Sequence, residues 1–301
     1  GAFLIPIISG IYSSMKENSM VVVPTRELAI QIRNSVKEFT DKDKGLQTAL
    51  IIGGEKIEPQ LRDLKKNPRI IIGTPGRIND HIRSKNLNLD KFHTLVLDEM
   101  DRMLDMGFST QIDEILETMP SGRQTLLFSA TATKKVEEKA QKYLNNPITI
   151  KIGEANQPSK NIEEKIVELK NSEKFNKLLD IVKGSEDYFL VFAGTQNSVT
   201  NISDKLNEYA LNSKPIHGGL RQRQRDSVIK SFRNKKFNIL VATDIAARGL
   251  DIHHIDYVIN YDMPKYPEDY IHRIGRASRS ENEKGTAISF TTSGDQAIWK
   301  G

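Results

Sequence analysis

Residues 95–101 read LVLDEMD, an aliphatic run that passes directly into acids. The run is typical of a buried strand, yet Asp98 and Glu99 follow it at once and Asp101 follows one residue later. A carboxylate at the edge of a core is costly unless a cation, an arginine or water compensates its charge. The stretch therefore predicts a buried strand whose end carries acids with a partner elsewhere in the chain.

The same order, a short apolar run followed by glycine, hydroxyl or charged residues, recurs along the chain. The other runs are MVVV (20–23), ALII (49–52), III (70–72), TLLF (125–128), FLVF (189–192), PI (215–216), ILVA (239–242), YVIN (257–260) and AISF (287–290). Helical stretches lie between them. One example carries Leu28, Ile32, Val36 and Phe39 at amphipathic spacing, with Thr25 as the expected N-cap. Continuous apolar strands that alternate with helices indicate an α/β fold of mostly parallel sheets with helices on both faces.

Chain length indicates two domains, since 301 residues exceed what one hydrophobic core normally serves. Residues 153–161, GEANQPSKN, are polar, contain Gly and Pro and interrupt the strand pattern. We therefore place a linker there, between domains at 1–152 and 162–301.

Composition excludes several classes of protein. The chain has no cysteine, which excludes disulfides and thiolate metal sites and is compatible with the cytosol. No apolar run approaches the roughly 18 residues of a membrane span, and the opening GAFLIPIISG lacks the basic region of a signal peptide. We expect a cytoplasmic protein without membrane contact, and its net charge of +5 permits a polyanionic partner.

The polar clusters follow the strands, and in parallel sheets ligands bind beyond the carboxyl ends of strands, where helix N-termini also point. The acids at 98 and 99 have two readings. They are either the solvated start of a helix, or a site where Asp98 holds Mg²⁺ through water and Glu99 orients or deprotonates an attacking water in phosphoryl transfer.

Two arginine motifs and one glycine pair in the first half also have two readings. PTRELA (24–29) and TPGR (74–77) are either helix caps, with Pro75 suited to the first helical position, or phosphate-binding turns. Together with Gly53 and Gly54 they could follow successive phosphates of one strand. SAT (129–131) is weaker as a motif, because Thr131 or Thr133 could simply cap the next helix.

HRIGRASR, residues 272–279, is the most specific segment. In a helix, His272 and Arg276 lie one turn apart and Arg276 shares a face with Arg279, so the two guanidiniums repel unless an anion lies between them. The alternatives are a solvated basic face or a pair of arginine fingers for a γ-phosphate.

In this order PTRELA, a GG pair, TPGR, D-E-x-D, SAT, VFAGT, HGGLRQRQR, ATDIAARGLD and HRIGRxxR resemble the motif series of the DEAD-box RNA helicases. The resemblance extends from just before Pro24 to the last strand. It implies two RecA-like domains that close together on ATP and single-stranded RNA and reopen after hydrolysis.

The resemblance implies roles for individual residues. Asp98 and Glu99 match the magnesium-binding and water-activating acids, Ser129 and Thr131 the element that couples hydrolysis to unwinding, Gly249 and Asp251 a nucleotide contact, and Arg276 and Arg279 the fingers. His272 and Arg273 match residues that bridge to the first domain, and Asp101 is expected in that interdomain network and not on the metal. The RNA-binding positions are Pro24, Thr25, Arg26, Gly53, Gly54, Thr74, Gly76, Arg77, Thr195, Gly218, Gly219, Arg225 and Thr243.

The expected ligands are ATP, Mg²⁺ and single-stranded or locally unwound RNA. No aromatic cluster accompanies the strand-end motifs, so we expect contacts to the backbone and not base stacking. The choice of RNA over DNA rests on the resemblance alone, and a DNA helicase of the wider superfamily is the competing class. A dehydrogenase is disfavoured because no G-x-G-x-x-G turn is present. We expect a monomer.

The sequence departs from the family pattern at three places. It has no G-x-x-x-x-G-K-[ST] phosphate loop, begins where that loop would have ended, and lacks the upstream glutamine motif and a central strand of the first sheet. We expect the truncated chain of an active helicase that by itself hydrolyses ATP poorly; the alternative is a hydrolysis-deficient RNA-binding relative. Met100 replaces the usual alanine, and Ala277 and Ser278 replace Thr-Gly, which could shift Arg279.

Overall fold

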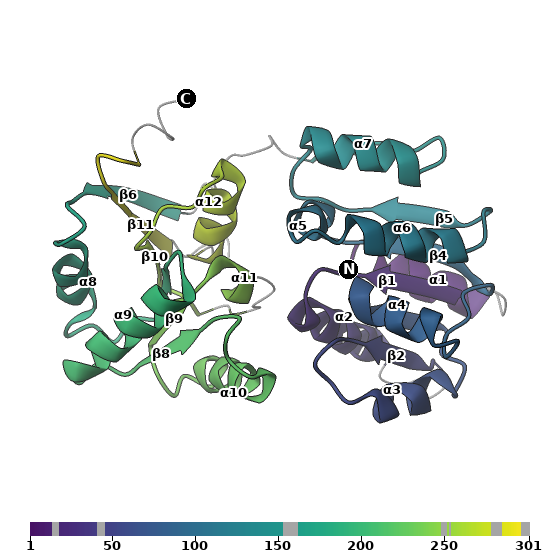
Figure 1. Ribbon diagram of the computed structural model, residues 1–301, viewed down its shortest axis with the longest axis horizontal. Helices are drawn as coiled ribbons and strands as arrows, with labels where there is room; N and C mark the ends of the chain where they lie inside the picture. The colour runs from purple at the N-terminus through teal and green to yellow at the C-terminus, as the bar shows by residue number, and fades with distance from the viewer. Residues whose placement is uncertain are drawn as a thin grey trace. The chain divides into compact units, whose positions relative to one another are not determined.

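The computed structural model describes residues 1–13, 18–40, 46–152, 162–247, 252, 254–277 and 285–295. The chain divides into two compact units, residues Gly1–Ala155 and Asn156–Gly301 (Figure 1). The predicted linker, residues 153–161, lies outside the described residues, so its ends remain a prediction. Each unit contains one parallel sheet with helices on both faces, which confirms the predicted α/β class.

The first unit is built on a sheet of five parallel strands in the order β2-β3-β1-β4-β5. The strands are β1 (Asn18–Val22), β2 (Thr48–Ile51), β3 (Ile70–Gly73), β4 (Phe92–Leu97) and β5 (Gln124–Leu127). The helices are α1 (Leu4–Ser13), α2 (Arg26–Phe39), α3 (Ile57–Leu64), α4 (Pro75–Arg83), α5 (Met100–Asp105), α6 (Ser109–Thr118) and α7 (Lys134–Tyr143).

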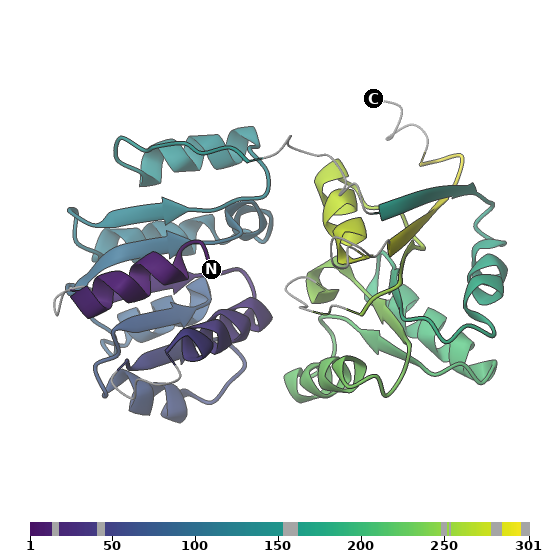
Figure 2. The ribbon, with the colours of Figure 1, turned by 180° about the vertical axis from the view of Figure 1, so that it is seen from behind.

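Alternate residues of the strands enter the two cores of this unit. Met20 and Val22 of β1 pack with the helices α4 to α7, whereas Val21 packs with α1 and α2. Figure 1 shows α4 and α6 on the near face of the sheet, and Figure 2 shows α1 on the opposite face. Successive side chains of a strand point to opposite faces of the sheet, so both faces are packed with apolar residues, as the continuous apolar runs predicted.

Strand β5 is the outer strand of this sheet and is only partly covered. Its residues are half-buried or exposed, whereas the last three residues of β4 are buried. Beside it lies a groove of about 840 Å³ that is lined by residues 121, 123–129, 142–148 and 150. In the described part of the chain β5 pairs with β4 alone, so its other edge offers backbone groups to which a further strand could pair.

The second unit has a sheet of six parallel strands in the order β6-β11-β10-β7-β9-β8. The strands are β6 (Ile162–Glu168), β7 (Phe189–Phe192), β8 (Ser213–Ile216), β9 (Ile239–Ala242), β10 (Tyr257–Asn260) and β11 (Gly285–Thr291). The helices are α8 (Lys174–Val182), α9 (Gln196–Glu208), α10 (Gln222–Arg233), α11 (Asp244–Ala247), α12 (Pro267–Ile274) and the 3₁₀ turn η1 (Gly275–Ala277). Strands β7, β9 and β10 are buried over most of their length.

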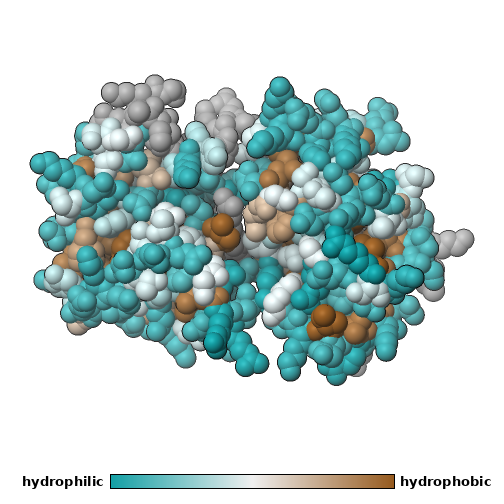
Figure 3. Space-filling model, in the orientation of Figure 1, coloured by the Kyte–Doolittle hydropathy of each residue, from teal (hydrophilic) through white to brown (hydrophobic). Residues whose placement is uncertain are grey.

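The surface of the chain is mostly polar. In the view of Figure 3 apolar side chains form small, separate patches on a hydrophilic surface. Among the described residues, every helix is too short or too polar to cross a bilayer.

Candidate functional site

The loop between β4 and α5 holds Asp98 and Glu99 in a fixed backbone conformation. The Asp98 N–H donates to the Val22 carbonyl at the end of β1 (3.1 Å), and the Met100 N–H donates to the Phe128 carbonyl after β5 (2.9 Å). Glu99 has φ 51° and ψ 52°, a left-handed conformation that costs a residue with a Cβ about 1–2 kcal/mol. Strain of this kind persists where the surrounding structure enforces it, and it is concentrated at functional sites.

The Asp98 carboxyl is poorly compensated in this loop. Burial raises its pKa above 3.8 and the neighbouring Asp101 carboxylate raises it further, against the lowering effect of the Glu99 N–H, which donates to Asp98 Oδ1 (3.0 Å). A cation near Asp98 would therefore stabilise its ionised form. In the described part of the chain no group of three or more histidine, cysteine or acidic side chains is placed to hold a metal ion. Mg²⁺ usually keeps several waters and uses one or two carboxylates, so the chemistry of the Asp98 carboxylate suits its water shell.

Asp101 connects the acid loop to the SAT segment within the first unit. The Asp101 side chain is buried, and its Oδ2 accepts hydrogen bonds from the Thr131 N–H (3.2 Å) and from Thr131 Oγ1 (3.1 Å). Ser129 Oγ donates to the Thr131 carbonyl (2.8 Å). The other Asp101 oxygen accepts from the Arg102 N–H (3.0 Å). Both carboxylate oxygens therefore bind partners of their own unit, and the interdomain role that the resemblance implied for Asp101 stays a prediction.

We expect an Asp101→Asn variant to lose about 1–3 kcal/mol of unfolding free energy, because an amide oxygen and an NH₂ group cannot satisfy the donors that now face two carboxylate oxygens. Urea unfolding of the chain measures the loss of unfolding free energy. Faster hydrogen exchange of the Thr131 amide would show that the loss arises at the contact between Asp101 and Thr131. Asp90→Asn, at an exposed acid of the same unit, should change stability by less than about 0.5 kcal/mol. Equal stability of the two variants would contradict the prediction.

The three predicted RNA motifs of the first unit meet at residue 55. Arg26, the first residue of α2, donates from Nη2 to Glu55 Oε1 (2.7 Å), and Arg77 near the start of α4 donates from Nη1 to the Glu55 carbonyl (3.1 Å). Glu55 directly follows Gly53 and Gly54, and Gly54 has a left-handed φ of 69°. Sequence reasoning placed the two arginines and the glycines but missed Glu55; its one signal is an acid next to a glycine pair.

Some members of these motifs have structural roles. Thr25 Oγ1 accepts the Leu28 N–H (3.3 Å) and so caps α2, whereas the Thr74 side chain makes no cap bond. The side chains of Pro24, Thr25 and Thr74 are buried. An added Cβ at Gly53 or Gly76 would meet nothing within 4 Å, so these two backbones are open to approach.

The predicted RNA residues of the second unit follow three neighbouring strands. Thr195 follows β7, Gly218 and Gly219 follow β8, and Thr243 follows β9, and these strands are adjacent in the order β7-β9-β8. The carboxyl ends of parallel strands lie at one edge of a sheet, so the structure brings these segments together. Arg225 lies on α10, where its Nη1 donates weakly to Gln222 Oε1 (3.4 Å).

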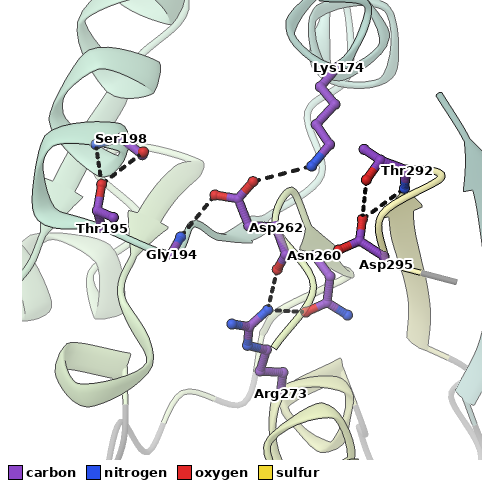
Figure 4. A network of polar contacts seen from close by, with 9 residues as sticks. All are labelled: Lys174, Gly194, Thr195, Ser198, Asn260, Asp262, Arg273, Thr292 and Asp295. Carbon is purple, nitrogen blue, oxygen red and sulfur yellow. Dashed lines mark hydrogen bonds and ion pairs between the residues drawn. The ribbon is translucent and has the colours of Figure 1, made fainter. Parts of the chain in front are cut away.

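A buried lysine and an aspartate support the turn at Thr195 (Figure 4). Asp262 Oδ2 accepts the Gly194 N–H (2.9 Å), and Asp262 Oδ1 binds Lys174 Nζ (3.2 Å), whose side chain is 6% exposed. Thr195 Oγ1 accepts the Ser198 N–H (3.1 Å) and caps α9. Neither Lys174 nor Asp262 was predicted as part of the site, because they lie outside the motif series and 88 positions apart in the sequence.

His217 holds the turn that contains Gly218 and Gly219. Its Nδ1 accepts the Gly219 N–H (3.2 Å) and its Nε2 contacts Thr200 Oγ1 (3.1 Å), so this network assigns the neutral ring with the proton on Nε2. Burial lowers the pKa of His217 below 6.5. Protonation at Nδ1 would remove the acceptor of the Gly219 N–H.

We expect His217 to make the second unit less stable at mildly acidic pH. The lowered folded-state pKa means that the unfolded chain binds this proton at a higher pH than the folded chain does. The stabilisation is complete above about pH 6.5, the unfolded value, and is lost as pH falls through the folded pKa. His217→Gln should reduce the loss of unfolding free energy between pH 7.5 and 5, and His93→Gln, at an exposed position, should not.

The segment HRIGRASR differs from the predicted continuous helix. Helix α12 ends at Ile274, and Arg276 lies in the 3₁₀ turn η1. The change from α-helix to 3₁₀ turn thus falls between His272 and Arg276, and both residues are half-buried. Gly249, Asp251, Ser278 and Arg279 lie outside the described residues.

Arg273 donates hydrogen bonds to three residues of the second unit. Its Nε and Nη2 donate to the two oxygens of Asp244 (2.6 and 2.8 Å), and its Nη1 donates to Asn260 Oδ1 (3.1 Å) and to the Asp262 carbonyl (2.6 Å). The guanidinium lies 4.9 Å from the ring centroid of Phe192. The resemblance implied a bridge from Arg273 to the first domain, which stays a prediction. Within its own unit the side chain is buried, and its planar fork of donors is used on these partners.

Two tandem parallel-sheet units with their polar motifs at the carboxyl ends of the strands define the class of tandem RecA-like proteins. Residues 1–139 match the family model described as DEAD/DEAH box helicase, and residues 173–281 match the helicase conserved C-terminal domain. The chain belongs to the DEAD-box helicase family.

Individual relatives agree with this family. The chain is 42% identical over 293 residues to "ATP-dependent RNA helicase CshA" of Listeria monocytogenes, over 96% of this chain and 56% of the relative. Saccharomyces cerevisiae Dbp5 L327V, bound to RNA and ADP BeF₃, aligns with a TM-score of 0.84 at 30% identity, over 99% of this chain and 80% of that one. A DEAD box protein from Methanococcus jannaschii is 40% identical with a TM-score of 0.51, over 94% and 76% of the two chains. The chain spans about half the length of the curated relatives it matches.

Proposed function

We propose that the chain acts as an ATP-dependent RNA helicase or RNA clamp, in which ATP binding and hydrolysis between two domains drive local unwinding of RNA. The observation that carries the proposal is the acid loop: a strained Glu99 beside a poorly compensated Asp98, joined through Asp101 to the SAT segment. The relatives, which are RNA helicases or proteins bound to RNA and a nucleotide analogue, support the same reading.

The nucleotide roles follow from the chemistry of each side chain. Mg²⁺ would neutralise charge on the phosphates, with Asp98 holding its water shell. Glu99 would orient and deprotonate the attacking water. Arg276 and Arg279 would place positive charge on the γ-phosphate, His272 would adjoin them, and Gly249 and Asp251 would contact the nucleotide.

RNA would be held through its backbone. In the first unit the groups available are Arg26, Arg77 and the backbone of Gly53, Gly54 and Gly76, near the buried Pro24, Thr25 and Thr74. In the second unit they are Thr195, Gly218, Gly219, Arg225 and Thr243. Phosphate contacts fix register but read no sequence, so we propose binding that is independent of base identity. A monomer in the cytoplasm remains our prediction.

Binding of a fluorescent single-stranded RNA, followed by anisotropy over a range of salt concentrations, tests this function. We expect binding that weakens linearly in logarithmic plots of affinity against salt, with little preference for base sequence. Arg77→Ala should weaken binding, whereas Arg83→Ala, an exposed arginine on the same helix that pairs with Glu114, should not. Equal binding of the unmodified chain and Arg77→Ala, or no RNA binding at all, would contradict the proposal.

Hydrolysis by a chain extended at Gly1 with the phosphate-loop segment of a family member distinguishes the proposal, which expects turnover there, from its alternative, a hydrolysis-deficient RNA-binding relative, which expects none. Because the 301 residues contain no G-x-x-x-x-G-K-[ST], we expect RNA binding without appreciable ATP turnover by the chain itself. Robust RNA-stimulated phosphate release by the chain would show that expectation wrong. Strand displacement on RNA and DNA duplexes separates an RNA helicase from a DNA helicase.

A further inference from the structure

We propose that Glu55 is an internal competitor of the RNA phosphate at Arg26 and so sets the affinity of the first unit for RNA. In the RNA-free chain its carboxylate occupies the guanidinium that the proposed function assigns to the RNA backbone. The inference rests on that proposed function, because it requires Arg26 to contact RNA.

Arg26 is the more buried member of the pair and Glu55 is the more exposed one. The Arg26 side chain is 13% exposed, whereas that of Glu55 is 51% exposed, although their atoms lie 2.7 Å apart. The Arg26 guanidinium packs against Gly54 so closely that a Cβ at residue 54 would collide with Nη1. The left-handed φ of Gly54 also disfavours a side chain there. Arg26 therefore keeps its place whether or not Glu55 is bound.

The backbone of Glu55 is held by a second arginine. Arg77 Nη1 donates to the Glu55 carbonyl (3.1 Å), while Arg77 Nε pairs with Asp80 (3.3 Å). Residue 55 is thus held through its carbonyl by one arginine of the proposed RNA site and through its carboxylate by the other. This placement returns the Glu55 side chain to Arg26 each time the RNA leaves.

The ion pair has the properties of a competitor and not of a structural brace. A half-exposed carboxylate can turn into water, where it recovers its hydration, so the pair adds little to folding stability. While it is formed, the pair is neutral and Arg26 cannot neutralise a phosphate. An arriving phosphate must either displace the Glu55 carboxylate or bind beside it against like-charge repulsion.

Glu55→Gln tests the competition because glutamine keeps the length and the hydrogen-bonding oxygen but removes the charge. We expect the dissociation constant for single-stranded RNA at low salt to fall about two- to fivefold, the range that exposed ion pairs support. We also expect the slope of log affinity against log salt to steepen by about 0.7, since one more arginine releases one counterion from a single strand.

Glu58→Gln is the matched control. Glu58 is an exposed acid three residues away, in the first turn of α3, and its loss changes the net charge equally. We expect its salt slope to equal that of the unmodified chain. Adding Arg26→Gln to Glu55→Gln should abolish the gain in affinity, because the freed guanidinium is then absent.

The outcomes separate this inference from the proposed function. If the chain binds RNA in a manner that depends on Arg77 but Glu55→Gln weakens binding or leaves the salt slope unchanged, Glu55 positions Arg26 or is inert, and the competition is overturned alone. If the unmodified chain binds no RNA, the proposed function and the competition are both overturned. A gain in affinity shared equally by Glu55→Gln and Glu58→Gln also overturns the competition, since it reflects net charge.

Discussion

A Glu99→Gln variant is expected to hydrolyse ATP about 10²- to 10⁴-fold more slowly in the presence of RNA than the protein with Glu99, with no loss of folding stability. Glutamine has the size of glutamate but cannot accept a proton from water. Both residues occupy the same left-handed conformation, φ 51° and ψ 52°, so the substitution leaves the backbone strain unchanged. The change in rate would therefore report on chemistry and not on folding.

Phosphate release under single-turnover conditions measures this effect. Because the 301 residues contain no phosphate loop and are expected to turn over little ATP, the comparison is made in a chain extended at Gly1 by the phosphate-loop segment of a family member. Glu117→Gln, at an exposed acid of the same unit, is the matched control and should retain the full rate. Equal rates for the extended chain with and without the Glu99→Gln substitution would remove Glu99 from the role of general base.

Replacing Arg273 by methionine should destabilise the second unit by about 3–5 kcal/mol, the range for removing one partner of a buried ion pair. Arg273 is 3% exposed and donates four hydrogen bonds, two of them to Asp244. Without it, Asp244 loses its counterion and the buried Asn260 loses a donor. The expected loss is a large part of the total stability of a typical domain, which is about 5–15 kcal/mol.

Hydrogen exchange of amides in β7 and β10, combined with denaturant unfolding of the whole chain, assigns that loss to the second unit. Arg223→Met, at an exposed arginine of α10, should change the unfolding free energy by less than about 0.5 kcal/mol. In a double variant of Arg273→Met and Asp244→Asn, the Asp244→Asn change should cost less unfolding free energy than it does alone. The reason is that Arg273→Met has already left the Asp244 charge unpaired. A loss below about 1 kcal/mol for Arg273→Met would show that water replaces the guanidinium.

The acid loop and the motifs around it were largely predictable. The run before Asp98 could only be a buried strand, and the acids that follow it had to lie at the ligand-binding edge of a parallel sheet. The proximity of Ser129 and Thr131 to that loop follows, because their strand β5 pairs with β4. The same reasoning correctly grouped Arg26, Arg77 and the glycine pair.

The ion pairs of Glu55 and Arg273 could not be predicted from the sequence in this way. The Arg26–Glu55 pair joins residues 29 positions apart, and the Arg273–Asp244 pair joins residues of two different motifs. The resemblance implied that Arg273 bridges to the first domain, which stays a prediction, but it gave no sign of the contacts that Arg273 makes within its own unit. The change from α-helix to 3₁₀ turn after Ile274 was equally hidden, because the spacing of HRIGRASR also suits a continuous helix.

The sequence by itself determined the strands, the helices between them and the edge of each sheet at which polar groups gather. It could do so because apolar periodicity and helix capping act over a few residues and are written in the order of the chain. Tertiary structure alone decided which polar groups pair: Glu55 with Arg26, Asp101 with Thr131, and Arg273 with Asp244. A hydrogen bond or ion pair depends on separations of about 3 Å, and these are set only when distant segments pack together.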